Sequence, residues 1–327
     1  MKALYLDHRP ILRDDLPEPQ PGPDEALLRV RLAGVCATDL ALTRGYAGGF
    51  RGVLGHELVA EILSAPAAPD RAGQRVTAEI NIPCGHCGDC AAGRPSHCRQ
   101  REVIGIRGRD GAFAEYLRVP LANLHPVPDP VSDEAAVFTE PLAAALQVQQ
   151  QLAVRPGQRV LVVGAGRLGQ LIARVLRLTG CDLSVVARHA RQRDLLAAAG
   201  VPWLGEDAVP GAWADVVVEA SGAPGGFALA RHAVRPRGTL CLKSTYEGAL
   251  RIDLSALVVD EISVVGSRCG PFPAALRLLA QGLVDPTPLI DARLPLKRAV
   301  EALDRAARPG TMKVLIDCRA AGAPAGG

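Results

Sequence analysis

The chain lacks a long apolar run, a strong excess of one charge sign, and an internal repeat. No apolar run approaches the roughly 20 residues that a membrane-spanning helix requires, so we expect no membrane partner. The formal net charge of +3 has no block structure, and the sequence therefore gives no reason to expect nucleic acid as a partner. The first ten residues lack the apolar core of a signal peptide, so we expect a cytoplasmic protein.

The composition that is present is typical of a globular protein, with 48% hydrophobic and 22% charged residues. A chain of 327 residues exceeds what one core usually holds, and we expect two domains. Nine cysteines in a reducing compartment indicate metal ligands and buried thiols before they indicate disulfides.

Short strand patterns dominate the chain up to about residue 124. Residues 26–32 alternate apolar and charged side chains, as a half-buried strand does. Similar short strands are expected at residues 58–63, 75–80 and 113–119. This pattern predicts an all-β domain, which one irregular excursion, residues 83–106, interrupts.

The pattern changes at Glu140-Pro141. An acid followed by proline is a good start signal for the helical run that follows. Strands then alternate with helices from residue 160 to residue 266, which predicts a parallel sheet covered by helices on both faces. Two further helices and a closing strand are expected after residue 271.

Four cysteines of the excursion form the pattern C-x2-C-x2-C-x7-C, at Cys84, Cys87, Cys90 and Cys98. Two-residue gaps let neighbouring thiolates converge on one tetrahedral ion, and the last cysteine closes its fourth corner. Four thiolates leave no open position, so this zinc would be structural. The alternatives are four reduced, unliganded thiols or two disulfides.

A second candidate metal site combines the thiolate of Cys36 with the imidazole–carboxylate pair His56-Glu57. Thiolate, imidazole and carboxylate suit zinc, and three protein ligands leave a position open for chemistry. Asp39 can accept the free N–H of His56 and so fix the ring, or it can be an acid at a helix start.

A glycine-rich turn, GAGRLG, follows a strand pattern and precedes a helix pattern. Gly164 allows the tight turn, Gly166 lets the backbone approach a pyrophosphate, and Gly169 lets helix and strand pack closely. The helix amides near Leu168 would face the phosphates. This context predicts a dinucleotide site.

The second strand of such a site usually ends in an acid that binds the ribose 2′-hydroxyl of NAD. Here Arg188 stands nineteen positions beyond Gly169, followed by His189 and Arg193. A missing acid removes repulsion against a 2′-phosphate, and arginine supplies a planar partner for it. The sequence therefore favours NADP(H) over NAD, unless these are ordinary surface residues.

The order of motifs is informative. G-x-C-x-T-D, G-H-E, the four-cysteine loop, E-P-L and G-x-G-x-x-G follow one another over nearly the whole chain. In this order they strongly resemble the zinc-dependent medium-chain alcohol dehydrogenases. The resemblance implies a GroES-like β-barrel catalytic domain, residues 1–142 completed by 271–327, and a Rossmann domain with a doubly wound parallel sheet, residues 143–270.

The resemblance also implies roles for single residues. Cys36 and His56 would bind a catalytic zinc, with Glu140 as the resting third ligand and Glu57 as a transient one. The reverse order of the two carboxylates, or a Glu140 that only caps its helix, stays open. Glutamate at position 140 is typical of the polyol, sugar and threonine dehydrogenase branch.

Thr38 matches the hydroxyl that relays the substrate proton in this family, although it can also be an ordinary helix N-cap. Many relatives have a histidine five residues after the zinc-binding cysteine, and here that residue is Ala41. The sequence therefore leaves the route of the proton to solvent open.

Ser221 would lie near the nicotinamide half of the cofactor. Lys313 would contact the cofactor phosphates or be a strand-edge lysine.

We therefore expect an enzyme that binds two zinc ions and interconverts an alcohol, polyol or sugar with its carbonyl form, using NADP or NAD. Family members are dimers or tetramers, which predicts a homo-oligomer. The alternatives are a zinc-free quinone or enoyl reductase of the same fold, and a nucleotide- or zinc-binding relative without catalysis.

Overall fold

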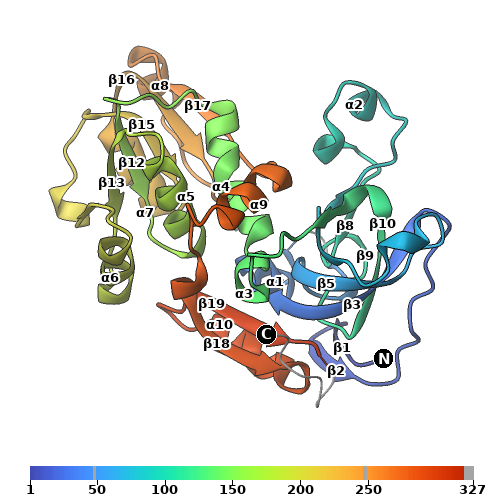
Figure 1. The fold of residues 1–327 in the computed structure, drawn as a ribbon. Coiled ribbons are helices and arrows are strands. Elements are labelled where there is room, and N and C mark those ends of the chain that lie inside the picture. The colour runs from blue at the N-terminus through green and yellow to red at the C-terminus, as the bar shows by residue number, and fades with distance from the viewer. Residues whose placement is uncertain (47–48, 246–248, 320–327) are drawn as a thin grey trace. The chain divides into compact units, whose positions relative to one another are not determined.

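The structure, a computed structural model, describes residues 1–46, 49–245 and 249–319. The chain divides into two compact units (Figure 1). Unit 1 comprises Met1–Glu140 and Ala275–Gly327, and unit 2 comprises Pro141–Ala274. These bounds lie two and four residues from the predicted domain boundaries at 142 and 270.

The main sheet of unit 1 has seven strands, and β3 (Glu25–Gly34) is central to it. The order is β11-β6-β5-β3-β19-β18, and β10 also pairs with β3. Gly34 lies opposite Glu57 on one neighbour and opposite Leu315 on the other. The remaining strands are β5 (Glu57–Ser64), β6 (Arg75–Ala78), β10 (Tyr116–Pro120), β11 (Leu124–Pro126), β18 (Ile290–Pro295) and β19 (Lys313–Asp317).

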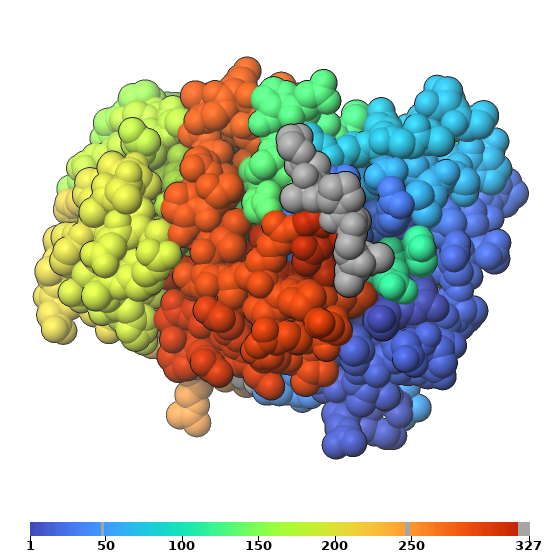
Figure 2. Space-filling view, turned by 60° about the horizontal axis from the view of Figure 1, so that its bottom comes forward, coloured from blue at the N-terminus to red at the C-terminus, as the bar shows by residue number. Residues whose placement is uncertain are grey.

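Unit 1 also contains two smaller sheets and short helices. Helix α10 (Ala299–Ala306) packs against β18 and β19, and in Figure 2 this red C-terminal segment lies beside the blue N-terminal strands. The excursion with α2 (Gly88–Ala91) projects from the rest of the unit in Figure 1. The small sheets are β2-β1-β4 (Pro10–Arg13, Ala3–Leu6, Gly52–Val53) and β7-β8-β9 (Asn81–Ile82, Glu102–Ile104, Gly108–Arg109).

The sheet of unit 2 is parallel throughout, in the order β14-β13-β12-β15-β16-β17. The chain starts in the middle, at β12, and winds outward in both directions, which is the predicted doubly wound arrangement. Its strands are β12 (Arg159–Val163), β13 (Asp182–Val186), β14 (Trp203–Leu204), β15 (Ala214–Glu219), β16 (Val234–Leu242) and β17 (Ser263–Gly266).

Four helices connect these strands: α5 (Arg167–Arg177), α6 (Ala190–Ala198), α7 (Pro224–Ala233) and α8 (Leu254–Val259). Helices α4 (Thr139–Gln151) and α9 (Phe272–Ala280) include the unit boundaries. None of the helices in the described part of the chain has both the length and the apolar composition needed to cross a bilayer.

The structure corrects some predicted elements. Helix α4 begins at Thr139, so Pro141 is its third residue, where the missing N–H still costs no helical hydrogen bond. Strand β10 begins at Tyr116 because the preceding residues pair elsewhere: the carbonyl of Phe113 accepts from the N–H of Leu4 at 2.7 Å. Strands β14 and β18 and helix α8 were not predicted, since two are very short and β18 lies in a proline-rich stretch.

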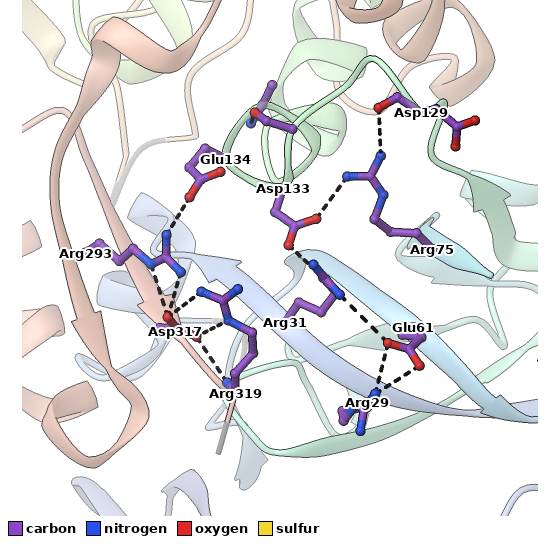
Figure 3. Close-up of polar contacts among 12 residues, drawn as sticks. Arg29, Arg31, Glu61, Arg75, Asp129, Asp133, Glu134, Arg293, Asp317 and Arg319 are labelled. Atoms are coloured by element: carbon purple, nitrogen blue, oxygen red, sulfur yellow. Dashed lines mark hydrogen bonds and ion pairs between the residues drawn. The ribbon is translucent and has the colours of Figure 1, made fainter. Parts of the chain in front are cut away.

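An ion-pair network ties α3 (Asp133–Ala136) to the main sheet of unit 1 (Figure 3). The carboxylate of Asp133 accepts from Nε of Arg31 at 2.7 Å and from a terminal nitrogen of Arg75 at 3.1 Å. Glu61 extends the network along the sheet through Arg29 at 2.9 Å and Arg31 at 3.8 Å. A second group joins α3 to β18 and β19 through Glu134, Arg293, Asp317 and Arg319.

Replacement of Asp133 by the isosteric asparagine should lower the free energy of unfolding by about 2 kcal/mol, because two partly buried guanidinium groups lose their charged acceptor. Urea unfolding followed by circular dichroism measures this. The matched control is Asp129→Asn, since Asp129 is exposed and Arg75 donates to its backbone carbonyl, not to its carboxylate. Equal stability of the two variants would contradict a structural role of the network.

Candidate functional site

Three ligand-type side chains converge where β3 ends and β5 begins. Ligand atoms of Cys36, His56 and Glu57 lie within 4.8 Å of one another. His56 and Glu57 are buried, and Cys36 is half-buried. A thiol, an imidazole and a carboxylate gathered out of water have the chemistry and the spacing of a zinc site. The residues present therefore fit a zinc ion.

Asp39 orients the ring of His56. The backbone N–H of Cys36 donates to Oδ2 of Asp39 at 2.8 Å, which places the carboxylate at the start of α1 (Ala37–Leu42). Its other oxygen, Oδ1, lies 3.2 Å from Nδ1 of His56. Nδ1 thus faces Asp39, and Nε2 is the nitrogen left for a metal.

Burial opposes the charged form of His56, but Asp39 and Cys36 outweigh it and raise the pKa of His56 well above its usual range. A metal ion at Nε2 would take the place of one of the two ring protons. Asp39 would keep the other proton on Nδ1, which holds the tautomer that a metal ligand requires.

Lys313 holds Glu57 from the other side. Its ammonium group lies 2.5 Å from Oε2 of Glu57 and 3.4 Å from the carbonyl of Val35, and its side chain is only 2% exposed. Gly34 makes room for this pair, since a Cβ there would collide with Oε2 of Glu57. The structure therefore places Lys313 on a buried carboxylate of unit 1, whereas we expected it on cofactor phosphates.

Of the other two residues predicted for this site, Thr38 lies beside Cys36 and Glu140 lies outside the cluster. Oγ1 of Thr38 is 3.8 Å from Sγ of Cys36, on the first turn of α1. Glu140, the second residue of α4, does not join the three-residue cluster found among the described residues. The structure thus brings Glu57, rather than Glu140, next to Cys36 and His56.

The four sulfur atoms of the excursion form a compact tetrahedron. Sγ of Cys87 lies 3.5 Å from Cys90 and 3.8 Å from Cys98, and Sγ of Cys84 lies 3.6 Å from Cys98 and 4.0 Å from Cys90. Sulfurs bound to one zinc at about 2.3 Å are about 3.8 Å apart. These separations fit zinc, and they are too long for a disulfide bond.

The thiols of this cluster share charge. Hydrogen bonds from the backbone and side chain of Cys90 lower the pKa of Cys87 to about 6. Partial removal from water, together with the neighbouring Cys87, raises the pKa of Cys90 to about 12. One thiolate is thus stable alone, whereas four thiolates together require a cation to balance them.

The glycine turn of unit 2 has the geometry that its motif predicts. Gly164 has a φ of +105°, and a Cβ there would lie 2.7 Å from the backbone of Ser221. A Cβ on Gly169 would collide with the carbonyl oxygen of Gly164. A Cβ on Gly166 would meet nothing within 4 Å, so the space in front of α5 is open for a ligand to approach. Leu168 is the second residue of α5.

The loop after β13 carries the predicted 2′ residues. Arg188 and His189 are exposed, and His189 is the N-cap of α6. Arg193 instead directs Nε to the carbonyl of Ala187 and a terminal nitrogen to the carbonyl of Arg188, both at 3.1 Å. Arg193 therefore stabilises the backbone of this loop. We had predicted that its side chain contacts the cofactor.

Three polar residues that the sequence did not single out fix these loops. Buried Gln170 donates to the carbonyl of Gln192 at 3.0 Å and accepts from Arg174 at 2.7 Å. Gln192 in turn accepts from the N–H of Arg188 at 3.2 Å. The sequence does contain one hint of this role: Gln170 and Arg174 interrupt the otherwise apolar buried face of α5.

Ser221 is held by another residue that the sequence did not single out. Its backbone N–H and its hydroxyl donate to the buried carboxylate of Glu219, at 2.7 and 2.5 Å. The hydroxyl also accepts from the N–H of Ala223 at 3.1 Å. This fixes the loop after β15 beside Gly164.

Comparison with known proteins supports this account of both units. The model of the alcohol dehydrogenase GroES-like domain matches residues 22–129. D-arabinitol dehydrogenase 1 of Uromyces fabae is 30% identical over 97% of this chain and 97% of its own length. The match confirms the predicted GroES-like domain.

Two solved structures resemble the chain over most of its length. A zinc-binding dehydrogenase from Sinorhizobium meliloti 1021 bound to NADP superposes with a TM-score of 0.90 at 29% identity, covering 97% of this chain and 98% of that chain. A short chain alcohol dehydrogenase from E. coli CFT073 complexed with NADH has a TM-score of 0.88 at 26% identity, covering 97% and 99%.

The two helix-start glycines should respond differently to alanine. Gly169→Ala should lower the free energy of unfolding by about 2 kcal/mol or more, because its methyl group meets a backbone carbonyl that cannot move aside. Gly166→Ala, the matched control, should be neutral or slightly stabilising, since its methyl group enters open space. Urea unfolding of both variants tests this, and equal losses would contradict the described turn.

Proposed function

The chain belongs to the family of zinc-type medium-chain alcohol dehydrogenases, and we propose that it binds a catalytic zinc ion with Cys36, His56 and one glutamate. It is an oxidoreductase that interconverts CH–OH and carbonyl groups by hydride transfer with NAD(P). The observation that carries the zinc proposal is the cluster of three ligand atoms within 4.8 Å of one another, two of them on buried side chains. Asp39 supports it, since a carboxylate behind a zinc-binding histidine fixes the ring.

Each residue of the cluster has its own task. Bound zinc would supply Lewis-acid polarisation of the substrate oxygen. The hydroxyl of Thr38, on the first turn of α1, accepts the proton that the substrate hydroxyl releases and at the same time donates its own proton onward along hydrogen bonds. Glu57 has a carboxylate oxygen in the cluster with Cys36 and His56, and Lys313 donates to its Oε2. Glu57 is therefore our first candidate for the third ligand, and Glu140 is the second.

Polyols and sugars are the proposed substrate class. A full-length relative is named as an arabinitol dehydrogenase, and Glu140 matches the glutamate that is typical of the polyol and sugar branch of the family. A zinc-free reductase would leave the thiol, imidazole and oriented carboxylate without a purpose. A zinc-binding protein without catalysis would use them, but it would have no use for the hydroxyl of Thr38 beside Cys36.

NADP(H) is the proposed preferred cofactor, with NAD(H) as the alternative. Arg188 and His189 stand at the end of β13 where the 2′ group of a dinucleotide would lie. One similar structure is bound to NADP and another to NADH, so the fold accepts both.

The second proposed zinc, held by the four cysteines, is structural. All nine cysteines are free of disulfides, as the proposed cytoplasmic location requires.

The proposed oligomer is a symmetric one that forms through the edge of the parallel sheet. β17 has only β16 as a sheet neighbour among the described strands. Large apolar side chains are exposed around it: Leu254 by 66%, Val258 by 75%, Val259 by 81% and Val264 by 45%. An exposed apolar edge strand favours pairing with another chain, and a second copy offers the same edge.

Metal content tests the zinc proposal. Purified protein should contain two zinc ions per chain, and Cys36→Ser should contain one and lose dehydrogenase activity on a polyol panel. Inductively coupled plasma mass spectrometry and cofactor absorbance measure the two quantities. Cys181→Ser is the control, because Cys181 lies outside both clusters of metal-ligand residues. One zinc per chain in both wild type and Cys36→Ser would rule out the catalytic site.

A single charge should break the oligomer. Val259→Glu should shift the mass measured by light scattering after size exclusion to that of the monomer, because two carboxylates would face each other in an apolar interface. Leu283→Glu is the control, since Leu283 is also an exposed apolar residue, 50% exposed, but belongs to unit 1. An unchanged mass for Val259→Glu would contradict this interface.

A further inference from the structure

An ion pair crosses the carboxyl ends of two neighbouring strands in unit 2. Strands β13 and β14 are parallel, with Val186 opposite Leu204. Arg188 and Glu206 each come two residues later, so the register sets them side by side. Nε of Arg188 donates to Oε1 of Glu206. The chain thus has an acid at the expected end of the sheet, but it comes from the 3-10 helix that follows β14 (Glu206–Ala208).

The backbone under Arg188 is fixed, although its side chain reaches into solvent. Gln192 accepts from its N–H at 3.2 Å, and Arg193 donates to its carbonyl at 3.1 Å. The guanidinium of Arg193 also stacks over the ring of Trp203 at 4.7 Å. The guanidinium of Arg193 is thus occupied by contacts within the loop. Of the two arginines, Arg188 is the one whose side chain is exposed to a ligand.

We propose that Glu206 is a specificity-determining residue that weakens the preference for a 2′-phosphate. The inference rests on the proposed function, because it places the adenosine ribose of NAD(P) beside Arg188. Glu206 acts in two ways. It occupies one edge of the guanidinium that a 2′-phosphate would use, and it sets a carboxylate close to that phosphate. A ribose 2′-hydroxyl carries no charge, so the carboxylate does not repel it.

The size of the effect follows from exposure. The side chain of Arg188 is 58% exposed and that of Glu206 is 39% exposed, so water and salt screen their interaction. Loss of the competing carboxylate and of its repulsion should therefore change affinity for a 2′-phosphate by about fivefold to tenfold, not by orders of magnitude. The effect should shrink at high salt.

The test uses two fragments of the cofactor on the full-length protein. Adenosine 2′,5′-bisphosphate carries the 2′-phosphate, and adenosine 5′-monophosphate lacks it. Isothermal titration calorimetry should find that Glu206→Gln binds the bisphosphate about fivefold to tenfold more tightly than wild type does. Its affinity for the monophosphate should stay within about twofold. The ratio of kcat/KM for NADP to that for NAD should rise by a similar factor.

Two further variants make the result specific. Arg188→Gln should weaken the bisphosphate about tenfold and leave the monophosphate unchanged, because the charged partner of the 2′-phosphate is lost. Glu301→Gln is the matched control: Glu301 pairs with Arg298 at a similar exposure, but in unit 1. It should bind both fragments as wild type does.

An unchanged ratio of the two affinities in Glu206→Gln would overturn the inference. So would a parallel loss of both affinities, which would make Glu206 a purely structural residue. Either result leaves the proposed function intact as long as wild type binds the fragments and reduces NAD(P) with an alcohol. Failure of wild type to bind either fragment or to reduce either cofactor would overturn the proposed function itself.

Discussion

The pairing of β3 with both β5 and β19 is the constraint on which the candidate site depends. It sets Gly34 opposite Glu57 on one side and opposite Leu315 on the other. Because Gly34 has no side chain, the carboxylate of Glu57 fits beside it and reaches Lys313. Three segments that are far apart in the chain thereby meet next to Cys36 and His56. A shift of either strand by one residue would turn these side chains to the opposite face.

The buried charges of the site are compatible with the proposed metal ion. Asp39 and Glu57 are carboxylates with almost no exposure, and a metal-bound Cys36 would add a thiolate. Lys313 supplies one positive charge, and a divalent zinc would balance the remaining two negative charges while His56 stays neutral. Buried charges are tolerated only when they are paired. A zinc ion would therefore offset the positive charge that His56 loses and the negative charge that Cys36 gains when both bind the metal.

Much of this could be predicted from the sequence, because motif order is local information. The spacing of Cys84, Cys87, Cys90 and Cys98 predicted that their sulfurs converge, and the glycines after β12 predicted a tight turn; the structure has both geometries. Contacts that depend on strand register could not be predicted. Lys313 on Glu57 requires knowledge that β19 pairs with β3, and Glu206 beside Arg188 requires the register of the two-residue strand β14. Such pairs arise from tertiary structure, and the sequence around each residue contains no pattern that predicts its partner.

Anomalous diffraction from crystals of the full-length protein, recorded at the zinc absorption edge, tests the central claim most directly. We expect two peaks of anomalous zinc scattering per chain, one inside the four-cysteine cluster and one in contact with Cys36 and His56. The second peak would also identify the third ligand, which we expect to be Glu57. A single peak, confined to the four cysteines while Cys36 and His56 contact only each other, would contradict the account.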